Sequence, residues 1–212
     1  MGMPVAPERA PLAAEQAHGG KALLIIDMIS AWDFPNAGKL AAGAATIAPR
    51  IATLKRRCQS AGVPAIYVND NHGYWRSDFG QLVLLSMQRE DGPGRRIVEA
   101  LRPGPDDYSV LKPKHSAFFA TPLDLLLRHL RVNSLIVTGV ATDQCIAMSA
   151  ADARMRDYDV LVPEDCVAAQ TAERNRRGLD YLREAQRMKT TVSSRIRLPA
   201  RRDQAGARQT KR

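Results

Sequence analysis

The sequence predicts an α/β protein, a three-layer α-β-α sandwich built around a mostly parallel, Rossmann-like central sheet. Short apolar runs alternate along the chain with longer segments whose apolar residues recur at helical spacing. The apolar runs are nearly continuous, which is typical of strands buried on both faces of a parallel sheet. The 212 residues, 45% of them hydrophobic, suffice for one sizeable core. We therefore expect one folded domain at 21–194, between a flexible arm at 1–20 and a basic, disordered tail at 195–212.

The expected elements follow one another in a regular order. The strands are apolar runs bounded by turn residues, at 21–28, 63–70, 108–114, 134–140 and 159–165, with an edge strand at 189–194. The helices are the segments of helical spacing, at 37–62, 95–103, 121–132, 143–158 and 171–188. Gly62 should stop the first helix, and Thr121 and Thr171 should cap the starts of two others. The long connection at 71–94 contains a short helix, and connections of this length often carry function.

The charge and cysteine content exclude several classes of protein. The tail from 195 to 212 holds seven Lys or Arg residues against one acid, Asp203, and so accounts for six of the nine net positive charges. It has no aromatic residue on which a base could stack, so a nucleic-acid partner is not expected. The apolar runs are too short to span a bilayer, and the start of the chain lacks the apolar stretch of a secretory signal. Three cysteines without framework spacing indicate a reduced, cytoplasmic setting.

Chemically useful side chains stand at the carboxyl ends of the expected strands. Asp27 follows the first strand, Asp70 ends the second, Lys112 lies near the end of the third, and the turn "GVATDQC" brings Cys145 after the fourth. Taken singly, Asp27 could cap a helix, Lys112 could be a surface lysine, and Cys145 could be a small buried residue. In an open parallel sheet, however, the carboxyl ends of the strands share one edge, where sites form. The combination favours a catalytic thiol.

A cysteine attacks as its thiolate, and this position has features that favour one. Cys145 is expected in the first turn of a helix, where backbone N–H groups and the helix dipole stabilise negative charge. Lys112 would add a second positive influence, and Asp27 would take the thiol proton. The small residues of the turn 139–142 would let backbone donors converge as an oxyanion hole. The other two cysteines have no partner suggested by spacing and are expected to be structural.

The chain resembles the isochorismatase-like cysteine hydrolases, which include nicotinamidases and N-carbamoylsarcosine amidohydrolases. Three segments carry the resemblance, in the order found in that family: "ALLIIDM", "LKPKHSAFFATPLDLLLRHL" and "LIVTGVATDQCIAMSAADARMRDYDVLVPEDCVAA". The resemblance implies a catalytic triad of Asp27, Lys112 and Cys145. Lys112 is preferred to Lys114 because the lysine of the family precedes its Ser-Ala-Phe element by a fixed gap.

The resemblance also implies a cis peptide bond between Val140 and Ala141. The N–H groups of Ala141 and Cys145 would then form the oxyanion hole. Nicotinamidases of this family hold a metal through an Asp-x-His motif and two further histidines. Here Asp70 and His72 match the motif, but no later histidine falls in the loop, and the others are poorly placed: His18, His115 and His129. Because two ligands are too few for a dedicated zinc site, we expect no metal and no other cofactor.

The resemblance does not identify the substrate. The position two residues after Asp27 is Ile29 where the family often has Gln, so nicotinamide is not favoured. We expect the loop after Asp70 to act as a lid over the pocket, with pocket walls formed by Trp32, Asn71, Trp75 and Phe118.

The expected function is hydrolysis of a C–N bond in a small amide or ureido substrate through a thioester intermediate. A hydrolase of the same fold with a non-amide substrate, as in isochorismatase itself, and a non-catalytic relative remain as alternatives. Because many members of the family are dimers or tetramers, we also expect a homo-oligomer.

Overall fold

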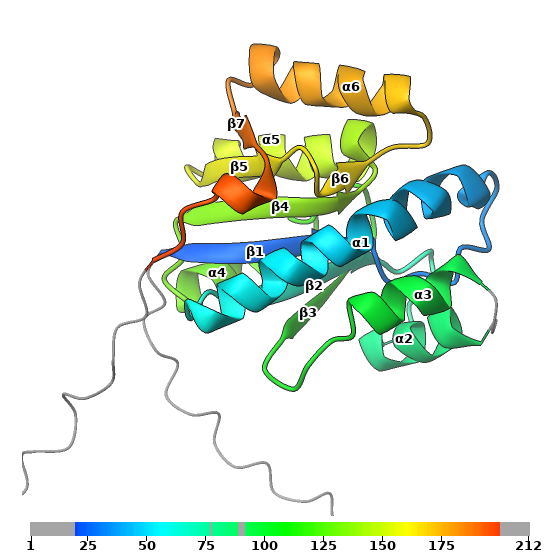
Figure 1. The fold of residues 1–212 in the computed structure, drawn as a ribbon. Helices are drawn as coiled ribbons and strands as arrows, with labels where there is room; N and C mark the ends of the chain where they lie inside the picture. The colour runs from blue at the N-terminus through cyan, green and yellow to red at the C-terminus, as the bar shows by residue number, and fades with distance from the viewer. Residues whose placement is uncertain (1–19, 77, 89–91, 200–212) are drawn as a thin grey trace, which may run out of the picture.

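Seven parallel strands form the central sheet, in the order β3-β2-β1-β4-β5-β7, with the short β6 paired to β4 (Figure 1). The computed structural model describes residues 20–76, 78–88 and 92–199. The strands are β1 Lys21–Ile26, β2 Ala65–Asp70, β3 Tyr108–Lys112, β4 Ser134–Val140, β5 Asp159–Pro163, β6 Val167–Ala168 and β7 Lys189–Thr191. The predicted fold class is confirmed.

Helices cover both faces of the sheet (Figure 1). They are α1 Ala37–Ser60, α2 Phe79–Met87, α3 Pro93–Ala100, α4 Leu123–His129, α5 Ala147–Met155 and α6 Ala172–Asp180. On β1, Leu23 and Ile25 pack toward α1 and α3, whereas Leu24 and Ile26 pack toward α4 and α5. Because successive side chains of a strand point to opposite faces, a run of apolar residues fills both layers at once. Among the described residues, no helix combines the length and hydropathy that crossing a membrane requires.

Some predicted boundaries differ from the structure. Thr171 caps α6 by accepting a hydrogen bond from Arg174 N, as predicted. Thr121 lies one residue before the helical cap at Pro122, although its hydroxyl still accepts from Leu123 N at 3.3 Å. Two expected helices contain π-helical turns, Thr142–Ile146 before α5 and Tyr181–Ala185 after α6. The two-residue β6 was not predicted, because so short a strand has no periodicity to detect.

The folded part continues beyond the predicted boundary at 194. A 3₁₀ turn spans Ser193–Arg195, Ile196 is buried, and Leu198 packs against the core on the α1 side. Arg57 of α1 donates hydrogen bonds to the carbonyls of Ser193 and Ile196, at 2.7 and 2.8 Å. The start of the predicted tail is therefore part of the domain. The remainder, 200–212, and the predicted arm except its last residue lie outside the described residues.

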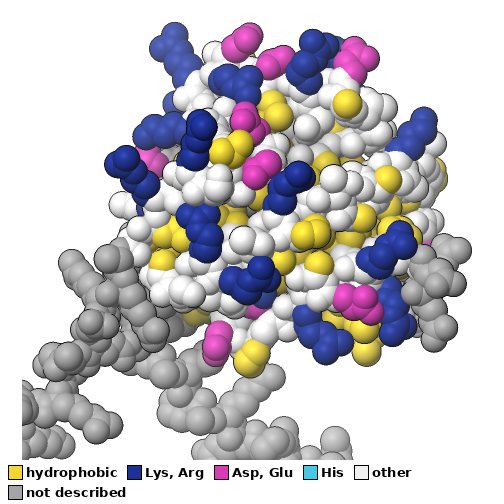
Figure 2. Space-filling model, viewed as in Figure 1, with side chains coloured by type: hydrophobic (Ala, Val, Ile, Leu, Met, Phe, Trp, Pro, Cys, Tyr) yellow, Lys and Arg dark blue, Asp and Glu magenta, His cyan; other side chains and the backbone are white. Residues whose placement is uncertain are grey.

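Lys and Arg side chains on the face shown in Figure 2 are interspersed with hydrophobic and acidic ones and do not gather into one basic track.

Candidate active site

The carboxyl ends of β1 and β4 approach each other closely, and this positions the candidate nucleophile. Ile26 of β1 lies in register with Gly139 of β4. Gly139 has φ +114°, and a Cβ there would lie 2.0 Å from the Ile26 carbonyl oxygen, so only glycine fits. The chain then passes through Val140 and a cis peptide bond to Ala141. The π-helical turn that carries Cys145 follows directly.

Helix α6 holds this turn in place. Arg174 Nε lies 2.6 Å from Asp143 Oδ2, and the Thr142 hydroxyl lies 2.5 Å from Asn175 Oδ1. A Cβ on Gly178 would lie 3.0 Å from the Thr142 side chain, so the α6 backbone packs directly against the turn. Rigid support of this kind keeps a nucleophile in a fixed geometry.

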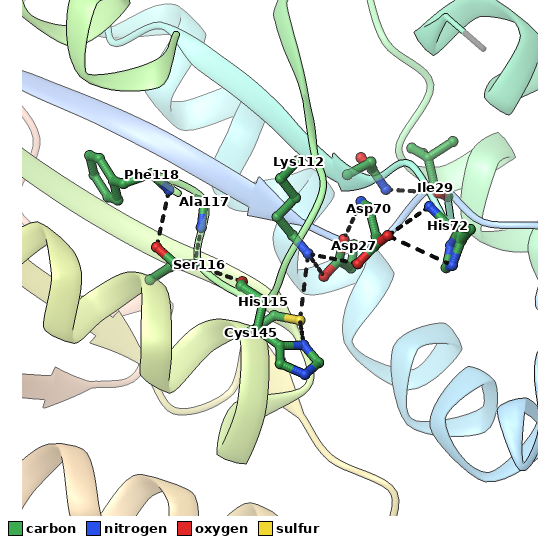
Figure 3. A network of polar contacts seen from close by, with 12 residues as sticks. Asp27, Ile29, Asp70, His72, Lys112, His115, Ser116, Ala117, Phe118 and Cys145 are labelled. Carbon is green, nitrogen blue, oxygen red and sulfur yellow. Dashed lines mark hydrogen bonds and ion pairs between the residues drawn. The ribbon is translucent and has the colours of Figure 1, made fainter. Parts of the chain in front are cut away.

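Three predicted catalytic side chains come together at this edge of the sheet (Figure 3). Lys112 Nζ lies 2.8 Å from Asp27 Oδ2 and 3.6 Å from Cys145 Sγ. It also lies 3.5 Å from Asp70 Oδ2, because Asp70 and Lys112 are register partners on β2 and β3. Asp27 Oδ1 accepts a hydrogen bond from Asp70 N at 2.7 Å. One buried ammonium group is thus shared by two carboxylates and a thiol.

The site favours the protonated thiol at rest, contrary to the expectation of a stabilised thiolate. Burial and the negative charge of Asp27 raise the pKa of Cys145, and the opposing influence of Lys112 is smaller. For Lys112, burial alone would lower the pKa, but Asp27, Cys145 and Asp70 together raise it above its ordinary value. Lys112 is therefore a permanent cation, whereas Cys145 needs a base to remove its proton.

His115 was not among the predicted catalytic residues, yet its Nδ1 lies 3.4 Å from Cys145 Sγ. Figure 3 shows the sulfur between the Lys112 ammonium and the His115 ring. The turn that carries His115 is tethered to α5 by two hydrogen bonds, from Ala117 N to Ser149 Oγ at 2.9 Å and from Ser116 Oγ to Asp152 Oδ2 at 2.6 Å. The strand was expected to run to Lys114, but it ends at Lys112, and the chain then turns toward Cys145. The motif "KPKHSAF" was the signal that could have indicated this proximity.

A cavity of about 330 Å³ opens beside Cys145, and Ala141 also lines it. Its apolar wall includes Trp32 and Phe34, whose ring centroids are 6.1 Å apart, and the Phe34 ring stacks on His72 at 5.8 Å. The remaining apolar lining is Ile29, Pro35, Leu40 and Val140, and the polar lining includes Ser30, Asn69, His115, Gln144 and Gln170. The cavity has room for a small molecule, and one of its walls is aromatic.

Of the four predicted wall residues, the structure places Trp32 on the cavity and the other three elsewhere. Trp75 is 78% exposed. Phe118 is buried in the opposite layer, with its ring 5.9 Å from that of Tyr158. Asn71 closes a turn in which its side chain accepts from Gly73 N at 3.0 Å. In the loop after Asp70, His72 still lines the cavity, but Asn71 and Trp75 do not.

Comparison with known proteins identifies the fold and the family. A family model described as the isochorismatase domain matches residues 21–195. The chain belongs to the isochorismatase family. YaaI, an isochorismatase family protein of Bacillus subtilis, is 38% identical over 157 residues, 73% of this chain and 84% of YaaI. The ureidoacrylate amidohydrolase RutB of Cronobacter sakazakii is 27% identical over 186 residues, 75% of this chain and 77% of that protein. The N-carbamoylsarcosine amidase of Thermoplasma acidophilum superposes with a TM-score of 0.60 at 26% identity, covering 83% and 98% of the two chains.

The metal of the nicotinamidases in this family does not fit the residues present. Asp70 Oδ1 accepts from His72 N at 2.7 Å, and Asp70 Oδ2 faces the Lys112 ammonium, so a cation at Asp70 would lie against a fixed positive charge. Among the described residues, no group of three or more His, Cys, Asp or Glu side chains is arranged to hold a metal ion.

Proposed function

We propose that this isochorismatase-family protein is a cysteine hydrolase that cleaves the C–N bond of a small amide or ureido substrate through a thioester. The observation that carries the proposal is the contact of Lys112 Nζ with Asp27 Oδ2 and with Cys145 Sγ, beside a small cavity that Asp27 and Cys145 line. Covalent acyl transfer uses a nucleophile and a base that a third group orients, and Cys145, Asp27 and Lys112 could fill these roles. The amidohydrolase relatives support the same chemistry.

In the first half-reaction, Asp27 takes the proton of the Cys145 thiol, and the sulfur attacks the substrate carbonyl carbon. Proton removal is needed because burial raises the pKa of this thiol. Lys112 holds the Asp27 carboxyl in place and offsets the charge of the thiolate. The carbonyl π electrons move to oxygen, and the N–H groups of Ala141 and Cys145 hold the resulting oxyanion.

The tetrahedral intermediate then collapses. The C–N bond breaks, Asp27 donates its proton to the leaving nitrogen, and ammonia or an amine departs. Asp27 then takes a proton from a water molecule, and the oxygen of this water attacks the thioester carbonyl carbon. The C–S bond breaks, the acid product leaves, and Asp27 returns the proton to the Cys145 sulfur. His115, on the side of the sulfur away from Lys112, hydrogen-bonds to the sulfur and supports its negative charge.

Ammonia release across a panel of small amides and ureido compounds tests the proposal. The Cys145→Ala variant should lose turnover, while Cys58→Ala should retain it, since Cys58 is fully buried in the α1 layer. Iodoacetamide should label Cys145 ahead of Cys58 and Cys166, because Cys145 lines the cavity, whereas the side chains of the other two have no exposed surface. Intact turnover in Cys145→Ala, with equal labelling of the three thiols, would refute the proposal.

A further inference from the structure

The cavity beside Cys145 has an imbalance of charge. Asp27 and Asp70 both line it, and among the described residues no Lys or Arg does. The nearest cation, Lys112, lies behind the carboxylates with no exposed surface. With one ammonium and two carboxylates, this group of three carries one net negative charge that faces the cavity.

The hydrogen bonds show which carboxylate supplies the surplus charge. Asp27 takes the short contact with Lys112, at 2.8 Å, whereas Asp70 lies 3.5 Å away. Asp70 Oδ1 accepts from the backbone N of His72 at 2.7 Å, and the His72 ring nitrogen is 4.0 Å distant. The Asp70 side chain is 25% exposed and lines the cavity. Asp70 is therefore the carboxylate that an incoming molecule meets with its charge least compensated.

Apart from the imidazoles of His72 and His115, no group among the other described residues of the lining could carry a positive charge that would offset it. Its polar groups are largely neutral amides, such as Asn69, Gln144 and Gln170, and its remaining wall is apolar and aromatic. A substrate carboxylate that entered the cavity would lose its hydration and would be repelled by Asp70. No fixed cation among the described residues of the lining would compensate for the lost hydration. Sites built to bind carboxylates usually present arginine for this purpose.

We infer that the site selects amide or ureido substrates that carry no carboxylate, and that Asp70 is the residue that excludes anions. The inference rests on the proposed function and narrows its substrate class. A neutral, partly apolar amide satisfies the lining: its body packs on the Trp32–Phe34 wall, and its polar atoms meet neutral amides.

A matched pair of thiol reagents tests this without knowledge of the substrate. Iodoacetamide and iodoacetate differ only in carrying an amide or a carboxylate, and both alkylate cysteine thiols. The rates are measured at pH 8 by mass spectrometry of the Cys145 peptide and divided by those for N-acetylcysteine in the same buffer. At this pH imidazole groups are in general uncharged, so the carboxylates dominate. The wild-type protein should prefer iodoacetamide by about tenfold after this correction, which corresponds to about 1.4 kcal/mol.

Two variants assign the effect. Asp70→Asn should reduce the preference severalfold, because it removes one negative charge at nearly constant shape. Asp106→Asn is the matched control: Asp106 is exposed near the amino end of β3, at the edge of the sheet away from the cavity, and this change should leave the preference as it is. No preference in the wild-type protein, a preference for iodoacetate, or equal shifts in both variants would overturn the inference.

Turnover provides a second measurement should Asp70→Asn fail to fold. Each amide that the wild-type protein hydrolyses is compared with its carboxylate-substituted analogue, for example benzamide with 4-carbamoylbenzoate. The neutral member should have the higher kcat/KM, and a faster anionic member would contradict the inference. Absence of ammonia release from every amide would instead refute the proposed function, while the alkylation preference would still decide the charge selectivity.

Discussion

Replacement of Lys112 by Met separates the proposed catalytic role of this lysine from its structural role. Met has a similar length and no charge. The change therefore creates little empty space in the core but leaves Asp27 and Asp70 without the cation that they share. Breaking a buried ion pair by removing one partner typically costs about 3–5 kcal/mol. Because the Asp27 and Asp70 side chains are 16% and 25% exposed, water offsets part of this cost, and we expect a loss near the lower end, about 3 kcal/mol. Turnover should fall by about 10³-fold or more, as for the loss of other triad members.

Lys55→Met is the matched control. Lys55 is also buried, pairs with Asp107 and hydrogen-bonds to the Tyr67 hydroxyl at 3.0 Å, but it lies outside the cavity. Its replacement should destabilise the fold to a similar extent and leave turnover unchanged wherever the variant is folded. Urea unfolding followed by circular dichroism, together with ammonia release, measures both quantities.

The pH dependence and a double variant complete the test. Because the pKa of Lys112 is raised in the folded protein, its contribution to stability is fully present at pH 7 and is lost only as pH rises above the ordinary lysine value of about 10.4. The Asp27→Asn, Lys112→Met double variant removes both members of the closer ion pair and leaves only Asp70 without its cation, so it should regain about 1–2 kcal/mol without regaining turnover. A stability loss below about 1 kcal/mol in Lys112→Met, or turnover within tenfold of wild type, would refute the reasoning.

Three further outcomes follow from the site. Asp27→Asn should abolish turnover. It should nevertheless make iodoacetamide label Cys145 severalfold faster at pH 8, because Asp27 raises the pKa of that thiol. Slower labelling of this variant would contradict the pKa argument. His115→Leu should lower kcat about tenfold with little change in KM. His115→Asn should retain most of the wild-type kcat, because it keeps a hydrogen-bonding group near the sulfur. Equal losses of kcat in the two variants would show that the hydrogen bond does not contribute to turnover. Gly139→Ala should cost about 3 kcal/mol or more in thermal unfolding, whereas Gly38→Ala, whose Cβ would meet nothing within 4 Å, should change stability by less than about 1 kcal/mol.

The sheet and the edge at which the site forms could be predicted because local patterns determine them. A run such as "ALLII" can be buried on both faces only inside a covered parallel sheet, and β1 is buried in this way. Once the strands are parallel, Asp27, Asp70, Lys112 and Cys145 must arrive at one edge whatever the loops do. The proximity of these four side chains could therefore be predicted from the strand topology alone, without knowledge of side-chain packing.

The cavity walls depend on loop paths, which leave little periodic signal in the sequence. Trp75 and Asn71 lie in a connection without apolar periodicity, and its direction is set by the turn at Asn71. His115 was missed because ending the strand two residues early changes where the chain turns. Errors of two residues at an element end are ordinary, but at the edge of a sheet they decide which side chains reach the nucleophile.

The protonation state of Cys145 shows why a correct list of residues does not specify a mechanism. Both the helix start and Lys112 favour a thiolate, and these features can be found in the sequence. Burial of the thiol and its nearness to Asp27 act in the opposite direction and are properties of the folded protein, and they prevail. A thiol that stays protonated at rest gives Asp27, under the proposed function, a role as the base in every turnover and not merely as a counter-ion to Lys112. In the proposed mechanism, the same carboxylate that opposes thiolate formation is the group that carries the proton from sulfur to the leaving nitrogen.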